Sequence, residues 1–189
     1  MMYLQLGQPI LILIVPFAIA YIVWYLVTRD KPIQPTRYFL TLYIGMFITQ
    51  AFHLGEEYFT GFYNTFPAFW SSLFYGNPAQ FGGWDTGFFL FGNFIMDVFW
   101  IAAIFLFAKG NSWANYTLYL FLSGMIVNVF AHPFYCVHLA NTESLQQFFT
   151  NELGLNYTWY FPGLWTSFVH AIFVVLMVRE IRKQLKMNY

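Results

Sequence analysis

Five apolar runs, each about as long as a membrane is thick, constrain this chain more than any other feature. They occupy residues 8–27, 36–62, 86–108, 116–137 and 160–178. A membrane-spanning helix needs roughly 20 predominantly apolar residues. Only 8% of the 189 residues are charged, while 59% are hydrophobic, and soluble domains carry about 25% charged residues. The sequence therefore excludes a soluble protein and predicts an all-α integral membrane protein, a bundle of five transmembrane helices.

The remaining segments complete a single membrane domain over residues 1–189. No basic segment precedes the first run, so we interpret it as a retained transmembrane helix rather than a signal peptide. Residues 63–85 and 138–159 form two long loops on one side. Glycine and proline interrupt the first of these loops, which we expect at the membrane interface, and the second has room for a short amphipathic helix. Residues 179–189 form a basic tail.

The basic residues predict the orientation of the bundle. All eight lie after the first, third or fifth run, with Arg37 at the very start of the second: Arg29, Lys31, Arg37, Lys109, Arg179, Arg182, Lys183 and Lys186. Cytoplasmic loops are enriched in Lys and Arg, so we expect the N-terminus outside and the C-terminus in the cytoplasm. Four or six spans would split the basic segments between the two sides. We therefore expect a multi-pass protein of the cell membrane, of the kind found in a bacterial inner membrane.

Charge and cysteine content exclude several classes of function. Lys and Arg equal Asp and Glu in number, so the formal net charge is zero. The chain has no excess of basic residues, so its charge does not indicate nucleic acid as a partner. The single cysteine, Cys136, rules out a disulfide framework and any cysteine-rich metal site.

Polar residues within four of the runs are the candidate functional residues, because ionisable groups at membrane depth are costly. They are His53, Glu56 and Glu57, then Asn93 and Asp97, then Asn128 and His132, and finally Thr166 and His170. Their spacing places each set on one helical face. At about 1.5 Å per residue, all four sets lie about 9–16 Å from the outer ends of their helices. We therefore expect one polar layer in the outer half of the membrane, facing the bundle interior.

Hydrogen bonding between helices is the simpler role for some of these residues. Asn93, Asn128 and Thr166, taken singly, are more typical of interhelical contacts worth about 0.6 kcal/mol each. We expect Glu57 to point toward the loop, while His53 and Glu56 face inward. Several carboxyls and imidazoles at one depth are too costly for that structural role alone.

Two chemistries fit this layer. In the first, which we favour slightly, His53, Glu56, Asp97, His132 and His170 bind a divalent metal ion such as Fe, Mn or Zn, as facing helices of bundles do. In the second, no metal is bound, and His53, Glu56, Glu57, Asp97 and His132 carry out acid–base catalysis in a desolvated site.

Two motifs stand out in the sequence. His53-Leu-Gly-Glu56-Glu57 has the pattern HXXEE, and the segment from Tyr160 to Thr166, YFPGLWT, has the pattern YXPGXXT. Together they resemble the motifs of the HXXEE domain family of small integral membrane proteins. The family's second histidine corresponds to His132 or His138, and depth favours His132, with His138 at the interface. The resemblance implies that Tyr160, Pro162, Gly163 and Thr166 belong with the His/Glu set. It implies little about activity, because the family has no established biochemical function.

The leading functional expectation is a membrane-embedded enzyme that acts on a lipid-like or isoprenoid-like small molecule. A proton- or cation-coupled transport protein is an alternative, although no inverted repeat and no polar path to the inner face accompany the outer layer. A regulatory membrane subunit is a third reading, in which the polar layer serves only assembly.

Overall fold

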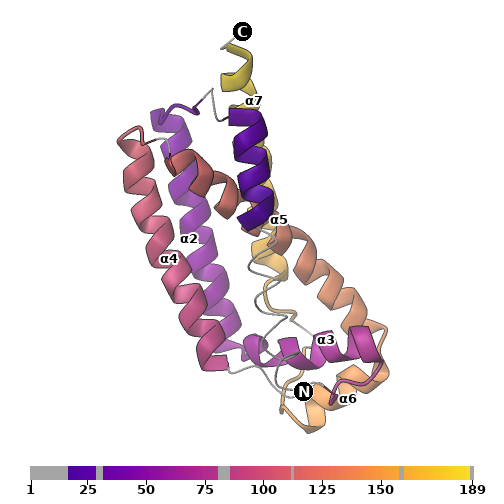
Figure 1. Ribbon diagram of the computed structural model, residues 1–189. Helices are drawn as coiled ribbons and strands as arrows, with labels where there is room; N and C mark the ends of the chain where they lie inside the picture. Colours follow the sequence, from indigo (N-terminus) through magenta and orange to yellow (C-terminus); the bar gives the residue numbers. More distant parts are fainter. Residues whose placement is uncertain (1–16, 29–31, 81–85, 112, 158–159, 188–189) are drawn as a thin grey trace.

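Helices form all the regular structure that the computed structural model describes, in residues 17–28, 32–80, 86–111, 113–157 and 160–187 (Figure 1). A helix over 17–23 continues into η1 (Trp24–Thr28). It is followed by α2 (Arg37–Phe59), η2 (Phe62–Thr65), α3 (Phe66–Tyr75), α4 (Thr86–Ala108), α5 (Trp113–Ala140), α6 (Glu143–Asn151) and α7 (Leu164–Met187). The expected all-α fold is confirmed for these residues.

Three helical stretches are long and apolar enough to cross a membrane: Phe91–Ala108, Trp113–Ala140 and Leu164–Lys186. They coincide with the third, fourth and fifth predicted spans and indicate a multi-pass membrane protein. Helix α2 occupies the place of the second predicted span but is not among these three. Residues 8–16 of the first predicted span lie outside the described residues, and Phe17–Leu26 forms a shorter apolar helix.

Helix α3 occupies part of the segment predicted as a loop. Pro67 lies in the first turn of α3, and Gly76 ends the helix with a φ of 68°. Proline is favourable at a helix start and glycine just past a helix end. These residues therefore bound a ten-residue helix instead of interrupting one. Helix α6 lies in the second loop, where a short amphipathic helix was expected.

The long helices run along the bundle, and α3 and α6 lie across one of its ends (Figure 1). Helix α7 packs against α2 and α5, and α4 packs against the same two helices. The start of α2, the α4–α5 turn and the end of α7 meet at the opposite end of the bundle (Figure 1). All described basic residues belong to these segments: Arg37, Lys109, Arg179, Arg182, Lys183 and Lys186.

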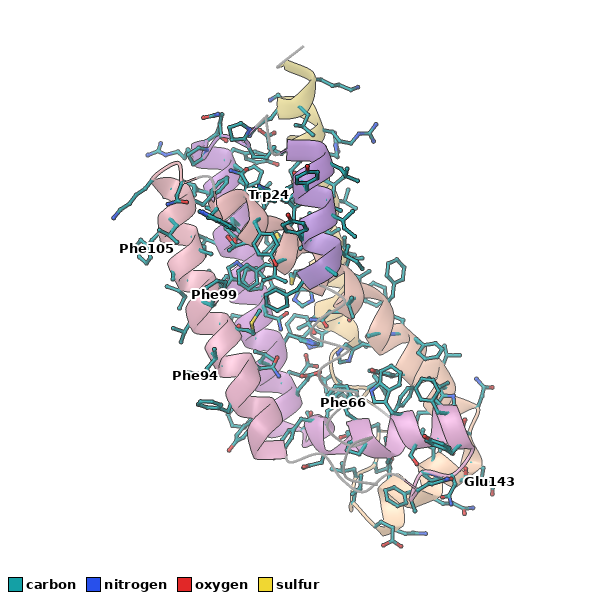
Figure 2. All side chains as sticks on the ribbon, in the orientation of Figure 1. Trp24, Phe66, Phe94, Phe99, Phe105 and Glu143 are labelled. Atoms are coloured by element: carbon teal, nitrogen blue, oxygen red, sulfur yellow. The ribbon has the colours of Figure 1, made fainter. Side chains whose placement is uncertain are left out.

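Large apolar side chains cover the outside of the bundle. Phe94 and Phe105 of α4 lie on the outside of the bundle (Figure 2), with exposed fractions of 65% and 66%. Several buried side chains, in contrast, are polar, among them His53, Glu57, His132 and His170. Soluble proteins rarely expose large contiguous apolar patches, so this surface suits contact with lipid.

Two apolar cores flank the buried polar residues. The bundle core joins α2, α4, α5 and α7 around residues such as Tyr43, Trp100 and Leu118. The cap core joins η2, α3, α6 and the second half of α5, around residues such as Phe62 and Leu145. Phe62 of the cap core packs on the His132 ring, with centroids 5.1 Å apart. The cap core therefore covers the polar site from the α3 and α6 end.

Candidate metal centre

Three buried side chains from two helices converge between these cores. Helix α2 contributes His53 and Glu57, and α5 contributes His132. One ligand atom from each lies within 4.8 Å of the other two. The Nε2 atoms of His53 and His132 are 3.4 and 3.2 Å from Glu57 Oε1. The three residues are 2%, 4% and 2% exposed, so this triad is closed to bulk solvent.

Local sequence explains how two helices supply the triad. His53 and Glu57 are four residues apart, and side chains at this spacing share one face of a helix. His132 comes directly before Pro133, which interrupts the hydrogen bonding of α5 from within the helix. The start of α7 then packs on His132, because a Cβ built on Gly163 would lie only 2.1 Å from His132 Nδ1.

The Nδ1 atom of each triad histidine is hydrogen-bonded to a residue at or just before the start of α7. His132 Nδ1 donates to the carbonyl oxygen of Pro162 at 2.9 Å, and His53 Nδ1 lies 2.8 Å from Thr166 Oγ1. A carbonyl oxygen only accepts, so the proton of neutral His132 is on Nδ1 and its Nε2 carries a lone pair. Metal-binding histidines are oriented in this way by the partner of their other nitrogen.

The hydroxyl of Thr166 orients His53 by the same principle. It lies 3.0 Å from the Gly163 carbonyl oxygen and 3.2 Å from Glu56 Oε2, two acceptors of which one takes its single proton. With the hydroxyl proton so placed, a lone pair of Thr166 Oγ1 faces His53 Nδ1, and His53 is the donor in the tautomer that suits metal binding. The Nε2 lone pair of His53 then faces Glu57, as that of His132 does.

The three side chains of the triad are close enough together to hold a metal ion. Two lone pairs and a carboxylate face one another, and no Lys or Arg pairs with Glu57 among the described residues. Tetrahedral metal ions with bonds of about 2.0–2.1 Å hold their ligand atoms roughly 3.3–3.4 Å apart. The distances from Glu57 Oε1 to the Nε2 atoms of His53 and His132, 3.4 and 3.2 Å, are close to that spacing. The donor set therefore fits a metal ion, and a shared proton is the alternative.

The two neighbouring carboxylates have the reverse of the expected positions. Glu57, expected to point toward the loop, lies between the imidazoles. Glu56, expected to face inward, is partly exposed outside the triad, where it accepts hydrogen bonds from Thr166 and from the hydroxyl of Tyr160. Trp165 Nε1 donates to the same Tyr160 hydroxyl at 3.2 Å. Glu56 and Tyr160 thus support the triad from its outer edge.

The other predicted site residues lie around the triad. Asp97 of α4 is partly buried and is not among the three convergent ligands, and Asn93 lies one turn before it. Asn128 donates to Gln50 at 3.0 Å, which is the interhelical role expected for it. His138 lies 3.2 Å from Ser72 Oγ, at the α3 end of α5. His170 is fully buried beside His53 but is outside the set whose ligand atoms lie within 4.8 Å.

Sequence reasoning missed two partners of the site. The Pro162 carbonyl binds His132, and a backbone atom leaves no signal in residue type. Gln50 lies three residues before His53, on the same helical face, and that spacing could have identified it.

Comparison of the chain with protein-family models, with curated proteins and with solved structures gave no match. The interpretation of the site depends on its own geometry.

Replacing Thr166 with valine tests whether the hydrogen bond to His53 supports metal binding. Valine keeps the shape but removes the acceptor for His53 Nδ1, and loss of such a partner typically weakens metal affinity 10–100-fold. Affinity for Zn²⁺ would be measured by competition with a chromophoric chelator. Thr49→Val is the matched control, because Thr49 lies on α2 and donates only within its own helix, to Gly45. Equal affinities of the two variants would contradict the prediction.

Proposed function

We propose that this protein is a membrane-embedded metalloenzyme that uses His53, Glu57 and His132 to act on a lipid-like or isoprenoid-like small molecule. The observation that carries the proposal is the buried triad, with two Nε2 atoms 3.4 and 3.2 Å from one carboxylate oxygen. Two histidines and one carboxylate are a donor set used by catalytic zinc and by non-haem iron. Fe, Mn and Zn are the ions we propose.

The number of protein ligands supports catalysis over a purely structural role. Structural zinc sites are normally closed by four protein ligands, whereas catalytic sites keep a position open for water or substrate. Only three described ligand atoms converge here. In this proposal the ion polarises a polar group of the substrate, and His53 and His132 are held in place by Thr166 and Pro162.

The surroundings support an apolar substrate. The triad lies in a bundle whose outer surface is apolar and aromatic, and the cap core covers its α3 and α6 end. Molecules that reach such a site partition into the membrane. The nearest partly exposed polar groups, Glu56 and Tyr160, connect the triad to the protein surface.

Five spans with the N-terminus outside and the C-terminus in the cytoplasm are part of the proposal. Helix α2 is included as a span, because its 23 residues run beside α4 and α7. The gathering of the described basic residues at the end opposite α3 and α6 supports this orientation. The triad then lies toward the outer side of a cell membrane.

We also propose membership of the HXXEE domain family. The residues of both motifs lie around one site: His53, Glu56, Glu57, Tyr160, Pro162, Gly163 and Thr166. His132 is in this proposal the family's second histidine, because it belongs to the triad and His138 does not.

Elemental analysis of the purified full-length chain tests the metal. We expect about one equivalent of Fe, Mn or Zn per chain, and a lower unfolding temperature after chelation, since a ligand bound only by the folded state stabilises it. The holoprotein would then be incubated with vesicles of total lipid extract, and products compared by mass spectrometry with those of chelated protein. Product formation without metal would replace this proposal with metal-free acid–base catalysis. Absence of both metal and product would contradict an enzyme.

A further inference from the structure

His170 is a fully buried histidine whose ring has no hydrogen-bond partner. It is 0% exposed, and neither Nδ1 nor Nε2 is hydrogen-bonded within the part of the chain that the structure describes. The Thr49 carbonyl approaches the ring without meeting hydrogen-bond geometry. Buried polar groups are almost always hydrogen-bonded, and each exception needs an explanation.

The position of His170 indicates what its partner is. It lies one turn after Thr166 on α7, and its ring centroid is 5.2 Å from that of His53, at an interplanar angle of 64°. It is outside the set of ligand atoms that lie within 4.8 Å of one another. His170 therefore borders the triad without belonging to it.

A residue that borders a metal site can contact a small molecule bound to the ion without binding the ion itself. A small molecule bound to a metal ion places its donor atom about 2.0–2.2 Å from the ion. A hydrogen bond from that molecule adds about 2.8–3.0 Å. An imidazole that contacts such a molecule thus lies next to the protein ligands but farther from the ion than they do.

Packing alone does not explain why position 170 is a histidine. Leucine or phenylalanine would fill a similar space in this apolar bundle without leaving two polar atoms unsatisfied. A neutral imidazole supplies one N–H donor and one acceptor, which is what water, a hydroxyl group or a small anion can use.

We infer that His170 binds the non-protein ligand of the metal ion, water in the resting protein and the polar head group of the substrate during turnover. This inference rests on the proposed function, because it requires an ion at His53, Glu57 and His132. It assigns to the substrate a hydroxyl, carbonyl or carboxylate group that hydrogen-bonds to imidazole.

Azide binding to the Co²⁺-loaded full-length protein tests the inference. Azide binds to open metal positions and accepts hydrogen bonds, and its binding changes the visible absorption of Co²⁺. We expect His170→Leu to weaken azide binding at least tenfold while Co²⁺ affinity changes less than threefold. His170→Gln keeps an N–H donor and should recover part of the azide affinity. His138→Ala is the histidine control and should leave both affinities unchanged.

The remaining outcomes separate this inference from the proposed function. Co²⁺ uptake with equal azide affinity in wild type and His170→Leu would overturn the role of His170 alone. A loss of Co²⁺ affinity of 100-fold or more in His170→Leu would also overturn it, because His170 would then be a ligand of the ion. Wild-type protein that takes up no Co²⁺ would overturn both proposals. Should His170→Leu fail to fold, His170→Phe replaces it, because phenylalanine keeps an aromatic ring but has no polar atom.

Discussion

Glu57→Gln is expected to weaken metal binding strongly while leaving the fold intact. The amide has the shape of the carboxylate but no charge, and its NH₂ group can donate to the Nε2 atoms of His53 and His132, which lie 3.4 and 3.2 Å from Glu57 Oε1. Loss of a metal-binding carboxylate should weaken affinity by roughly 100-fold or more, beyond the 10–100-fold typical of partners that only orient a ligand. Chelator competition with Zn²⁺ measures the affinity, and circular dichroism in detergent checks the fold.

Glu56→Gln is the matched control for that experiment. Glu56 is the adjacent carboxylate, and it accepts hydrogen bonds from Thr166 and Tyr160 without joining the triad. Its amide variant should weaken Zn²⁺ binding less than about tenfold, the lower limit for an outer partner. A larger loss with Glu56→Gln than with Glu57→Gln would show that Glu56 is the metal ligand.

Gly163→Ala is expected to destabilise the protein strongly, because the added methyl group meets both backbone strain and a close contact. Gly163 has a φ of 78°, and a Cβ there would lie 2.1 Å from Nδ1 and 2.2 Å from Cε1 of His132. The left-handed conformation costs an alanine about 1–2 kcal/mol, and overpacking adds typically 1–3 kcal/mol. We therefore expect the free energy of unfolding to fall by about 2–5 kcal/mol, as measured by thermal unfolding in detergent. Metal affinity should fall as well, because the His132 ring must move.

Gly76→Ala separates the two contributions. Gly76 has a φ of 68° at the end of α3, and a Cβ there meets no atom within 4 Å. The Gly76→Ala variant has the backbone strain but no close contact. Its free energy of unfolding should therefore fall by about 1–2 kcal/mol, with metal affinity unchanged. Equal unfolding temperatures for the two glycine variants would contradict a close approach of Gly163 to His132.

The helices could be predicted from the sequence because a long apolar run in a membrane has few alternatives to helix. Helices α4 and α5 lie within three residues of the expected spans. Helix α7 begins four residues later than expected and continues nine residues further, through most of the segment expected as a basic tail. Helix α3 was missed because Pro67 and Gly76 act differently at helix ends than inside a helix. Whether Pro67 and Gly76 fall at the ends of a helix or inside one depends on how α3 packs onto α6 and η2.

Two members of the triad, His53 and His132, could be predicted as metal ligands, but the choice between the two neighbouring carboxylates could not. At about 100° per residue, Glu57 lies roughly 40° from His53 around the helix and Glu56 roughly 60° on the other side. Both are neighbours of His53, and only the placement of His132 and Thr166 on the surrounding helices decides which carboxylate is buried. The distance of Asp97 from the triad likewise depends on how α4 packs, which its own sequence does not encode.

The division of the triad between helices has a consequence for how the protein is made. Two ligands are on α2 and the third is on α5, while the groups that orient both imidazoles come from Pro162 and Thr166 at the start of α7. Helices α2 and α5 are therefore synthesised before the residues that orient their imidazoles. The triad reaches its final geometry only when α7 has inserted beside both helices, so the order of helix insertion controls when this site is assembled.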